Sequence, residues 1–275
     1  MISIEMITKN DNNINKSING ILNQEFKDFE IIIVDSSIED HYKDYENTSR
    51  IKYIHDVNSN FLRARFNANK VASGDYVLLL DSTRILSKGV LANCINLSKT
   101  NDMIIIPEIN RSKSKILNEN NKTKKSADEI LSNCDPVNGI FLPRFYKKKL
   151  LDEAFHQVLS NLDKNEINNI CSLEDRMLYL ESLKISNKIS VCKSYLIHTE
   201  SESLMNYIKK YYRYGKCNYY VFSRISRYSY LGDPRLKKEN KGNSIHKNSL
   251  KNQILFFIKA ISFILGFLSD KFKHQ

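Results

Sequence analysis

An aspartate that directly follows an apolar run is the residue best placed for chemistry in this chain. Residues 74–84 read Gly-Asp-Tyr-Val-Leu-Leu-Leu-Asp-Ser-Thr-Arg, and the apolar or aromatic residues 76–80 end at Asp81. A short apolar run without alternation is typical of a strand buried on both faces, as in a parallel sheet under helices. Ligands of open α/β sheets bind beyond the carboxyl ends of the strands. Asp81 is therefore expected where a diphosphate or its metal ion would bind.

Strands and helices alternate over the first hundred residues, which predicts the sheet that positions Asp81. We expect strands at 2–7, 29–34, 51–54, 76–80 and 103–106, and helices at 14–23, 61–71 and 90–97. Further strands are expected at 139–145 and 190–197, helices at 150–162 and 173–183, and a long helix from 204. The alternation predicts an α/β fold: a mostly parallel sheet flanked by helices over residues 1–203, with a helical extension over 204–275.

The extension is basic and ends in an apolar segment. The chain has a net charge of +11, and residues 206–275 hold 15 Lys and Arg against 3 Asp and Glu, so the body is nearly neutral. Residues 254–268 are apolar nearly all round, but they fall short of the ~20 residues that a spanning helix needs. Flanking lysines favour a helix lying in the headgroup layer of an anionic membrane. A helix docked on the body and a true span are the alternatives, and no nucleic-acid partner is expected.

The cysteines and the N-terminus favour the cytoplasm. The five cysteines are scattered, odd in number and without metal-ligand spacing, which is typical of reduced thiols. Residues 1–7 begin a strand pattern without a basic segment or a long apolar segment, so we expect no signal peptide. Together with the extension, these features predict a peripheral protein on the cytoplasmic face of a membrane.

Several short segments together resemble the inverting family 2 glycosyltransferases, which have the GT-A fold. The resemblance covers roughly residues 2–216 and rests on the order and spacing of residues 17–24, 30–35, 63–67, 72–76, 80–81 and 173–176. Tyrosine and basic residues interleave after His198, at 210–216, which resembles a membrane-associated subset of this family. The resemblance implies a transferase that uses a nucleotide-diphospho sugar.

For the sugar donor, the resemblance implies a carboxylate and a turn at the nucleoside and a cation at the diphosphate. Asp35 takes the place of an aspartate that accepts hydrogen bonds from the base, and the turn from Thr8 to Asn10 lines the nucleoside. Arg65 is the better phosphate candidate, and Arg63, two residues away on a helix, points elsewhere. The alternatives are a turn or helix-cap residue for Asp35 and a surface cation for Arg65.

Members of this family usually bind Mg²⁺ or Mn²⁺ through an Asp-x-Asp motif at the end of the fourth strand. Here the triplet is Asp81-Ser82-Thr83, so the second carboxylate is missing, and a hydroxyl is a poorer ligand for a hard dication. The resemblance implies His198 as a further ligand, and imidazole suits Mn²⁺ better than Mg²⁺. We therefore expect a divalent cation, Mn²⁺ or Mg²⁺, at Asp81 and His198, bound weakly; that Asp81 holds the ribose of the donor is the alternative. A hydrogen-bonded loop histidine is the alternative.

Transfer with inversion needs one base that takes the proton of the acceptor hydroxyl. Glu174 and Asp175 open the expected helix at 173–183, at the place of the acceptor-site acidic pair of the family. We assign Asp175 as the base and Glu174 as an orienting or acceptor-binding group. The alternative is that both carboxylates only favour the helix dipole.

These features predict an enzyme that moves a sugar from a nucleotide-diphospho sugar to a hydroxyl of a glycan or polyprenyl-linked acceptor, in one displacement with inversion. A catalytically inactive relative that binds a sugar nucleotide or a lipid-linked glycan is the main alternative, and the incomplete metal triplet favours it. A nucleotidyltransferase is a weaker alternative, because no Gly-rich loop follows Ile7 and the chain has 8 glycines.

Overall fold

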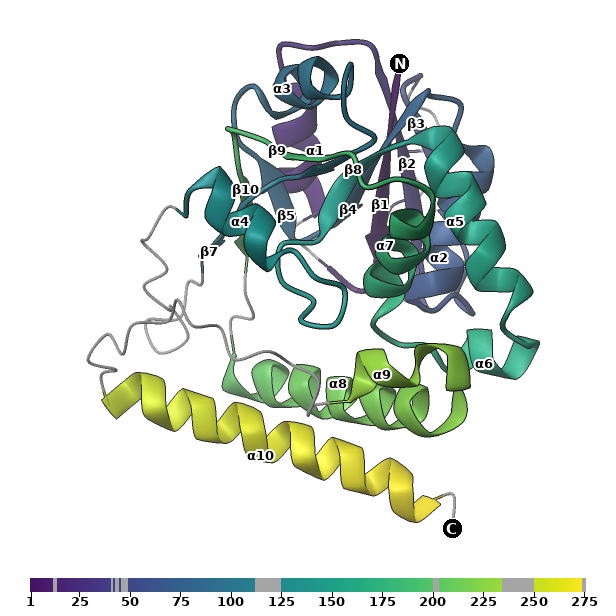
Figure 1. Cartoon of the computed structure of the whole chain (residues 1–275), viewed down its shortest axis with the longest axis vertical. Helices are drawn as coiled ribbons and strands as arrows, with labels where there is room; N and C mark the ends of the chain where they lie inside the picture. The colour runs from purple at the N-terminus through teal and green to yellow at the C-terminus, as the bar shows by residue number, and fades with distance from the viewer. Residues whose placement is uncertain are drawn as a thin grey trace.

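A seven-stranded mixed sheet forms the centre of the body (Figure 1). The computed structural model describes residues 1–11, 14–40, 42, 45, 49–111, 125–199, 203–233 and 250–273. The strands of the sheet are β1 (Ile2–Thr8), β2 (Phe29–Asp35), β3 (Ile51–His55), β4 (Tyr76–Asp81), β6 (Met103–Ile105), β8 (Pro143–Lys147) and β9 (Ile189–Val191). Their order is β3-β2-β1-β4-β8-β6-β9, and β8 alone among them runs antiparallel to its neighbours. The predicted mostly parallel α/β sheet is thus confirmed.

The register of the parallel strands brings three of the predicted site residues to one edge. Thr8 of β1 is paired with Asp35 of β2, and Ile7 is paired with Asp81 of β4. Because all three strands run in the same direction, their last residues lie at the carboxyl edge of the sheet.

A second sheet of three short strands extends this edge. It has the order β5-β10-β7 and consists of β5 (Arg84–Leu86), β10 (Leu196–Thr199) and β7 (Glu108–Arg111). In its register, His198 is paired with both Arg84 and Asn110. Three polar residues that lie far apart in the sequence therefore share one row.

Two sequence-based strand predictions differ from the structure. The expected strand at 190–197 is divided into β9 and β10, which belong to different sheets because the chain turns between them. The expected strand at 139–145 begins at Pro143, because the preceding residues form a turn closed by a bridge between Asp135 and Ile140.

Helices cover both faces of the large sheet. One apolar cluster joins α1 (Ile14–Leu22) and α3 (Val90–Leu97) to alternate residues of β1 and β4. The opposite face is covered by α2 (Phe61–Val71), α5 (Lys148–Ser160) and α7 (Glu174–Ile185). Shorter helices are α4 (Ala127–Asn133), α6 (Lys164–Asn169) and α9 (Ser229–Gly232). Burial on both faces explains why the strands read as continuous apolar runs.

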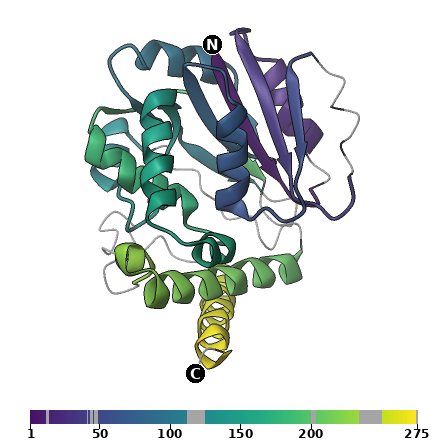
Figure 2. The same ribbon diagram turned by 90° about the vertical axis from the view of Figure 1, so that its right-hand side faces the viewer.

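Helix α8 (Leu204–Arg224) lies beyond the carboxyl edge of the sheet, as Figures 1 and 2 both show. Its Cys217 and Val221 join the apolar cluster formed by α5 and α7. The Cys217 Sγ donates a hydrogen bond of 3.3 Å to the carbonyl of Ser172, two residues before α7 begins. The basic helix is therefore packed beside the start of α7, where Glu174 lies.

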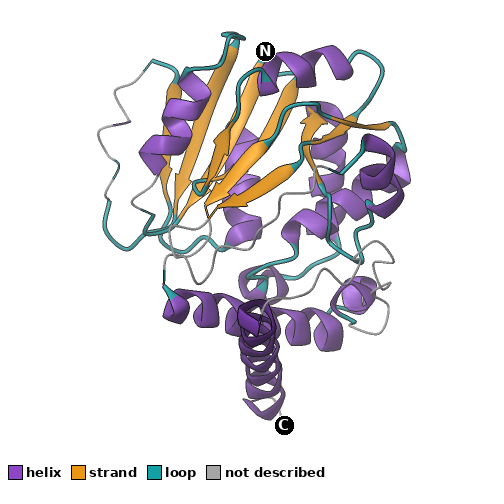
Figure 3. Ribbon diagram, turned by 90° about the vertical axis from the view of Figure 1, so that its left-hand side faces the viewer, coloured by secondary structure: helices purple, strands orange, loops and turns teal. Residues whose placement is uncertain are grey.

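Helix α10 (Leu250–Lys273) lies on the side of α8 that faces away from the sheet (Figures 2 and 3). The two helices approach closely at glycines: a Cβ on Gly215 would overlap the carbonyl oxygen of Phe263, and a Cβ on Gly266 that of Tyr212. The helix has 24 residues, and its segment Gln253–Phe272 is 20 residues long, with a mean hydropathy of 1.6. By length and composition alone, this segment suffices to cross a membrane.

The close approach of the two helices at Gly266 predicts that a larger side chain there weakens the packing of α10 on α8. Gly266→Leu forces α8 and α10 apart, because overpacking at such a contact costs about 1–3 kcal/mol. We expect backbone amides of α10 to exchange with solvent about tenfold or more faster, while those of β1 and β4 keep their protection. Ile264→Phe, which adds bulk on the exposed face of the same helix, is the control. Unchanged exchange in Gly266→Leu would contradict the described packing.

Candidate active site

Asp81 lies at the carboxyl end of β4, and both of its carboxylate oxygens are paired with arginines. Its Oδ1 accepts a hydrogen bond from Nη2 of Arg65, and its Oδ2 forms an ion pair with Nη1 of Arg84. The Arg65 side chain is 3% exposed and donates from Nη1 to the carbonyls of Glu5 (3.2 Å) and Leu80 (2.6 Å). Arg65 therefore ties the backbones of β1 and β4 to the carboxylate of the last residue of β4.

The two arginines of α2 point in different directions, as their spacing predicts. The Arg63 side chain is 46% exposed, and its Nε lies 3.9 Å from the carboxylate of Asp56. Arg65 is buried, so it is not the surface cation of the alternative interpretation. Because its donors are directed to two carbonyls and Asp81, direct contact of Arg65 with a phosphate stays a prediction.

A chain of alternating charges continues from Asp81 along the small sheet. Arg84 Nε donates to Oε1 of Glu108 at 2.9 Å, and Nε of Arg144 donates to the same oxygen. The other carboxylate oxygen of Glu108 lies 3.9 Å from Nδ1 of His198, which is 3.2 Å from Oδ1 of Asn110. The small sheet and the first residues of β8 thus build a polar cluster next to Asp81.

The electrostatics favour the ionised forms of Glu108 and Arg144. Burial alone would raise the pKa of Glu108, but the charges of Arg144 and Arg84 outweigh it and hold that pKa well below its usual range. Burial likewise disfavours the charge of Arg144, but Glu108 and then Asp175 outweigh it and raise the pKa of Arg144. The influence of Asp175 on Arg144 indicates that both belong to one electrostatic environment.

Glu174 and Asp175 open α7 at the same edge of the sheet. Glu174 is 8% exposed; burial, and then the charge of Asp175, raise its pKa to about 7, while Arg65 opposes the shift. Asp175 is partly exposed, and its Oδ1 accepts a hydrogen bond of 2.8 Å from the backbone N–H of Arg176. The preceding Leu173 has a φ of 75°, a strained conformation for a branched side chain. The charge of Asp175 thus acts on Arg144 and on Arg65, which pairs with Asp81.

The predicted nucleoside turn lies at the next strand end. Asn10 has a φ of 52°, and its backbone N–H donates to Oγ of Ser37 at 2.8 Å. The fully buried Asp35 accepts from the backbone N–H of Ser37 (2.9 Å) and from the Tyr53 hydroxyl (3.1 Å). Asp35 therefore holds the turn after β2, which favours the turn-residue interpretation. Its contact with a nucleoside base stays a prediction.

Thr8 is the residue of this turn with an unused polar atom. Its Oγ1 is buried and has no hydrogen-bond partner within the described ranges. A buried hydroxyl without a partner costs free energy unless a ligand or water satisfies it. The observation is consistent with the predicted place of Thr8 at a ligand.

The side chains around Asp81 do not fit a tight site for a divalent cation. Both oxygens of Asp81 already face guanidinium groups, position 83 supplies a threonine, and His198 faces Asn110 and Glu108. Within the part of the chain that the structure describes, no three His, Cys, Asp or Glu side chains gather as ligands. Binding of Mn²⁺ or Mg²⁺ at Asp81 and His198 stays a prediction that no contact here supports.

Sequence reasoning missed three members of this cluster: Arg84, Glu108 and Arg144. Arg84 directly follows the incomplete metal triplet, so its charge was a visible signal that another group occupies that place. Glu108 and Arg144 come from separate segments that β7 and β8 bring together, and no local pattern links them.

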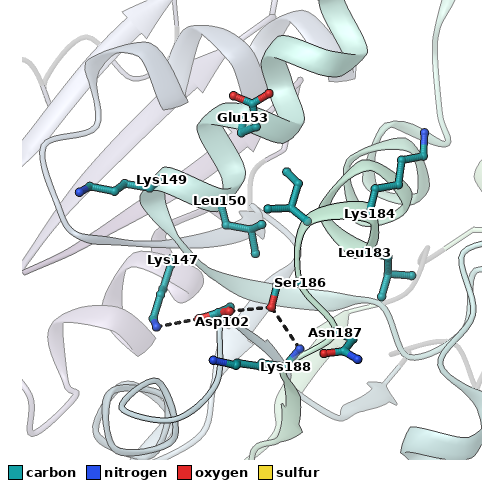
Figure 4. Close-up of a pocket in the computed structure, with 11 residues that line it drawn as sticks. Asp102, Lys147, Lys149, Leu150, Glu153, Leu183, Lys184, Ser186, Asn187 and Lys188 are labelled. Atoms are coloured by element: carbon teal, nitrogen blue, oxygen red, sulfur yellow. Dashed lines mark hydrogen bonds and ion pairs between the residues drawn. The ribbon is translucent and has the colours of Figure 1, made fainter.

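A hollow of about 660 Å³ lies at the opposite edge of the sheet (Figure 4). It is lined by several lysines and by Asp102, which pairs with Lys147 at 2.6 Å. Lys147 is paired with Tyr76, the first residue of β4, so the hollow lies at the amino-terminal edge, away from Asp81. It therefore plays no part in the candidate active site.

Comparison with known proteins identifies the class to which this fold and site belong. Residues 3–159, more than half of the chain, match the sequence profile of glycosyl transferase family 2. The chain belongs to glycosyl transferase family 2, and the predicted family is confirmed. A search of curated proteins by sequence finds no match.

Solved structures of S. aureus TarS share the fold. TarS 1-349 aligns with a TM-score of 0.57 and 17% identity, over 96% of this chain and 80% of that one. Its complex with UDP-GlcNAc aligns with a TM-score of 0.57 and 21% identity, over 81% of this chain and 66% of that one. Its complex with UDP aligns with a TM-score of 0.56 and 18% identity, over 100% and 91%. The predicted GT-A fold is thereby confirmed.

The raised pKa of Glu174 predicts a pH-dependent stability effect. Its folded-state pKa exceeds the unfolded value, so stability falls as pH rises from about 5 through 7 and the buried carboxyl ionises. We expect Glu174→Gln to raise the free energy of unfolding by about 2–3 kcal/mol at pH 8 and by about 1 kcal/mol at pH 5. Denaturant unfolding at both pH values measures this. The exposed Glu25→Gln is the control, and an equal effect of Glu174→Gln at both pH values would contradict the burial of Glu174.

Proposed function

We propose that this protein transfers a sugar from a nucleotide-diphospho sugar to a hydroxyl acceptor, with inversion at the anomeric carbon. The observation that carries the proposal is the common environment of Asp81 and Asp175. Arg65 pairs with Asp81, and the charges of Glu174 and Asp175 act to raise the pKa of Arg65. The charge of Asp175 also acts to raise the pKa of Arg144. Cations for a diphosphate and a carboxylate for an acceptor thus share one edge of the sheet.

In the proposed reaction, Asp175 acts as the general base. The acceptor oxygen forms a bond to the anomeric carbon from the face opposite the diphosphate, while its proton moves to the Asp175 carboxylate. The bond between the anomeric carbon and the diphosphate oxygen breaks, and its electron pair stays on the diphosphate. Nearby guanidinium groups stabilise the charge that develops there. Glu174, which is more buried, orients Asp175 or the acceptor.

The donor class is supported by the family and by two complexes of a structural neighbour. TarS 1-349 has been solved with UDP-GlcNAc and with UDP. In this chain, Thr8 lies beside the end of β2, and its hydroxyl has no hydrogen-bond partner among the described residues. Asn10, two residues further on, has a positive φ. The nucleoside is proposed to bind at this turn.

The proposed acceptor is a glycan that is carried on a polyprenyl or other lipid and is presented at a membrane surface. Eight large apolar side chains of α10 are more than a third exposed, and all of them except Phe256 recur at helical spacing on one face: Ile254, Phe257, Ile261, Ile264, Leu265, Leu268 and Phe272. Their spacing forms one stripe along the helix. An exposed stripe of this length is typical of a membrane or protein contact.

The other face of α10 packs on the aromatic and basic helix α8. Tyr211 makes an edge contact with Tyr207, and the Lys259 ammonium lies 4.8 Å from the Tyr211 ring centre. Lys216 lies 3.7 Å from Asp270. Helix α8 also contacts Ser172, which lies three residues before Asp175. A membrane bound by α10 would therefore lie near Asp175, where the acceptor is proposed to bind. A peripheral place on the cytoplasmic face of a membrane follows as part of the proposal.

The role of Asp175 is tested by Asp175→Asn. We expect turnover to fall about 10²- to 10⁴-fold, because the amide takes no proton, while binding of the nucleoside diphosphate is kept. Release of nucleoside diphosphate from a panel of nucleotide sugars, with membrane lipid extracts as acceptor source, measures turnover. Calorimetry measures binding.

Asp128→Asn is the matched control, because Asp128 also lies in the first turn of a helix, α4, away from the site. It should turn over like the wild type. Wild-type turnover in Asp175→Asn would refute the assignment of the base. A wild type that binds sugar nucleotide without turnover under all conditions would support the inactive relative instead.

The membrane role is tested on the exposed stripe of α10. The triple variant Phe257→Ser, Ile264→Ser and Leu268→Ser should bind vesicles of phosphatidylcholine and phosphatidylglycerol at least about tenfold more weakly, because each apolar side chain contributes about 1.5–3 kcal/mol on burial. Vesicle flotation of the full-length protein measures this. High salt should also weaken binding.

A matched control carries serine at three exposed apolar residues of the body, Ile38, Val57 and Ile185. It should float with the vesicles like the wild type. Equal flotation of both variants, or a wild type that does not bind these vesicles at low salt, would refute the membrane contact.

A further inference from the structure

Three arginines gather at the carboxyl edge, where a donor diphosphate is proposed to bind. Arg65, Arg84 and Arg144 are 3%, 11% and 12% exposed. They alternate with two carboxylates, because Asp81 bridges Arg65 and Arg84, and Glu108 bridges Arg84 and Arg144. Arginines this deeply buried are rare unless they are paired or bind an anion.

The cluster leaves no place for a dication on Asp81. A divalent cation would have to displace a guanidinium from each carboxylate oxygen, and it would then lie next to two displaced positive charges. Like charges a few ångströms apart repel strongly at low local dielectric. The neutral Thr83 supplies no carboxylate to offset that repulsion.

Part of the cluster's donor capacity is unused. Nε of Arg84 and Nε of Arg144 both donate to Oε1 of Glu108. This one oxygen therefore holds both guanidinium groups in place. Neither Nη2 of Arg84 nor either terminal nitrogen of Arg144 donates a hydrogen bond to any described residue. A guanidinium held by its Nε presents its terminal nitrogens as a fork that matches phosphate oxygens.

We propose that Arg84 and Arg144 bind the donor diphosphate and supply the positive charge that a divalent cation supplies elsewhere, so that donor binding needs no metal. This inference rests on the proposed function of the same site. As the bond between the anomeric carbon and the diphosphate breaks, its electron pair passes to a diphosphate oxygen that accepts hydrogen bonds from the two guanidinium groups. Glu108 and Asp81 act as positioning residues, because they hold the arginines and not the ligand.

Calorimetry on the wild-type protein tests the proposal without an acceptor. The probes are the diphosphates of uridine, guanosine, cytidine, adenosine and thymidine, each titrated in EDTA and in Mn²⁺. For the tightest probe, we expect dissociation constants that agree within about twofold between the two conditions. Binding that appears only with Mn²⁺ would overturn this inference and leave the proposed function standing. Absence of binding for all probes in both conditions would overturn the proposed function, and this inference with it.

Two variants sharpen the result. Arg144→Gln should weaken binding of the same probe about tenfold to a hundredfold in EDTA, since hydrogen bonds to charged groups are the strong ones. The exposed Arg63→Gln is the control and should bind like the wild type. Wild-type affinity in a folded Arg144→Gln would contradict the role of Arg144.

The double variant Thr83→Asp with Arg84→Ser supplies the missing carboxylate and removes the competing guanidinium. We expect its affinity for the probe to become dependent on Mn²⁺, and paramagnetic resonance to detect bound Mn²⁺ that the wild type lacks. Tight Mn²⁺ binding by the wild type in that measurement would overturn the inference.

Discussion

The buried guanidinium of Arg65 is the interaction on which the candidate active site depends. It links the carbonyls of Glu5 and Leu80, on two central strands, to the carboxylate of Asp81. Burial lowers the pKa of Arg65 to about 10, against the charges of Glu174 and Glu5, so the group stays charged at neutral pH. Burial also raises the pKa of Glu5 to about 8, and neither of its carboxyl oxygens has a hydrogen-bond partner among the described residues. Among these carboxyl groups, Asp81 is the one that pairs directly with the Arg65 guanidinium.

The remaining polar groups of the site are positioned relative to this pair. The small sheet holds Arg84 against Asp81 and Glu108, and the start of β8 adds Arg144. Such a fixed array of charges needs little reorganisation when a diphosphate leaves, which is the main source of catalysis in preorganised sites. On the other side, α8 packs against Ser172, so the basic helix, which carries the apolar α10, meets the body next to the carboxylate proposed as base. The proposed donor chemistry and the proposed membrane contact are thus joined through one short connection.

Much of this arrangement could be predicted from the sequence, because the strands are buried on both faces and read as apolar runs. The end of β4 at Asp81, the helix that begins at Glu174 and the opposite directions of Arg63 and Arg65 follow from local spacing. The strands of the small sheet have three or four residues each, too few for a periodic signal, and they pair over long sequence separations. The α10 helix extends beyond the expected apolar segment, and at its C-terminal end Ser269 and Asp270 continue the helix against α8.

The most direct test of the account is a crystal structure of this protein with a bound nucleoside diphosphate. The account predicts diphosphate oxygens within hydrogen-bond distance of Arg84 and Arg144, with the carboxylate of Asp175 facing the position from which the sugar departs. A diphosphate bound in the lysine-lined hollow at the amino-terminal edge of the sheet, or separated from Asp175 by the body of the protein, would contradict it.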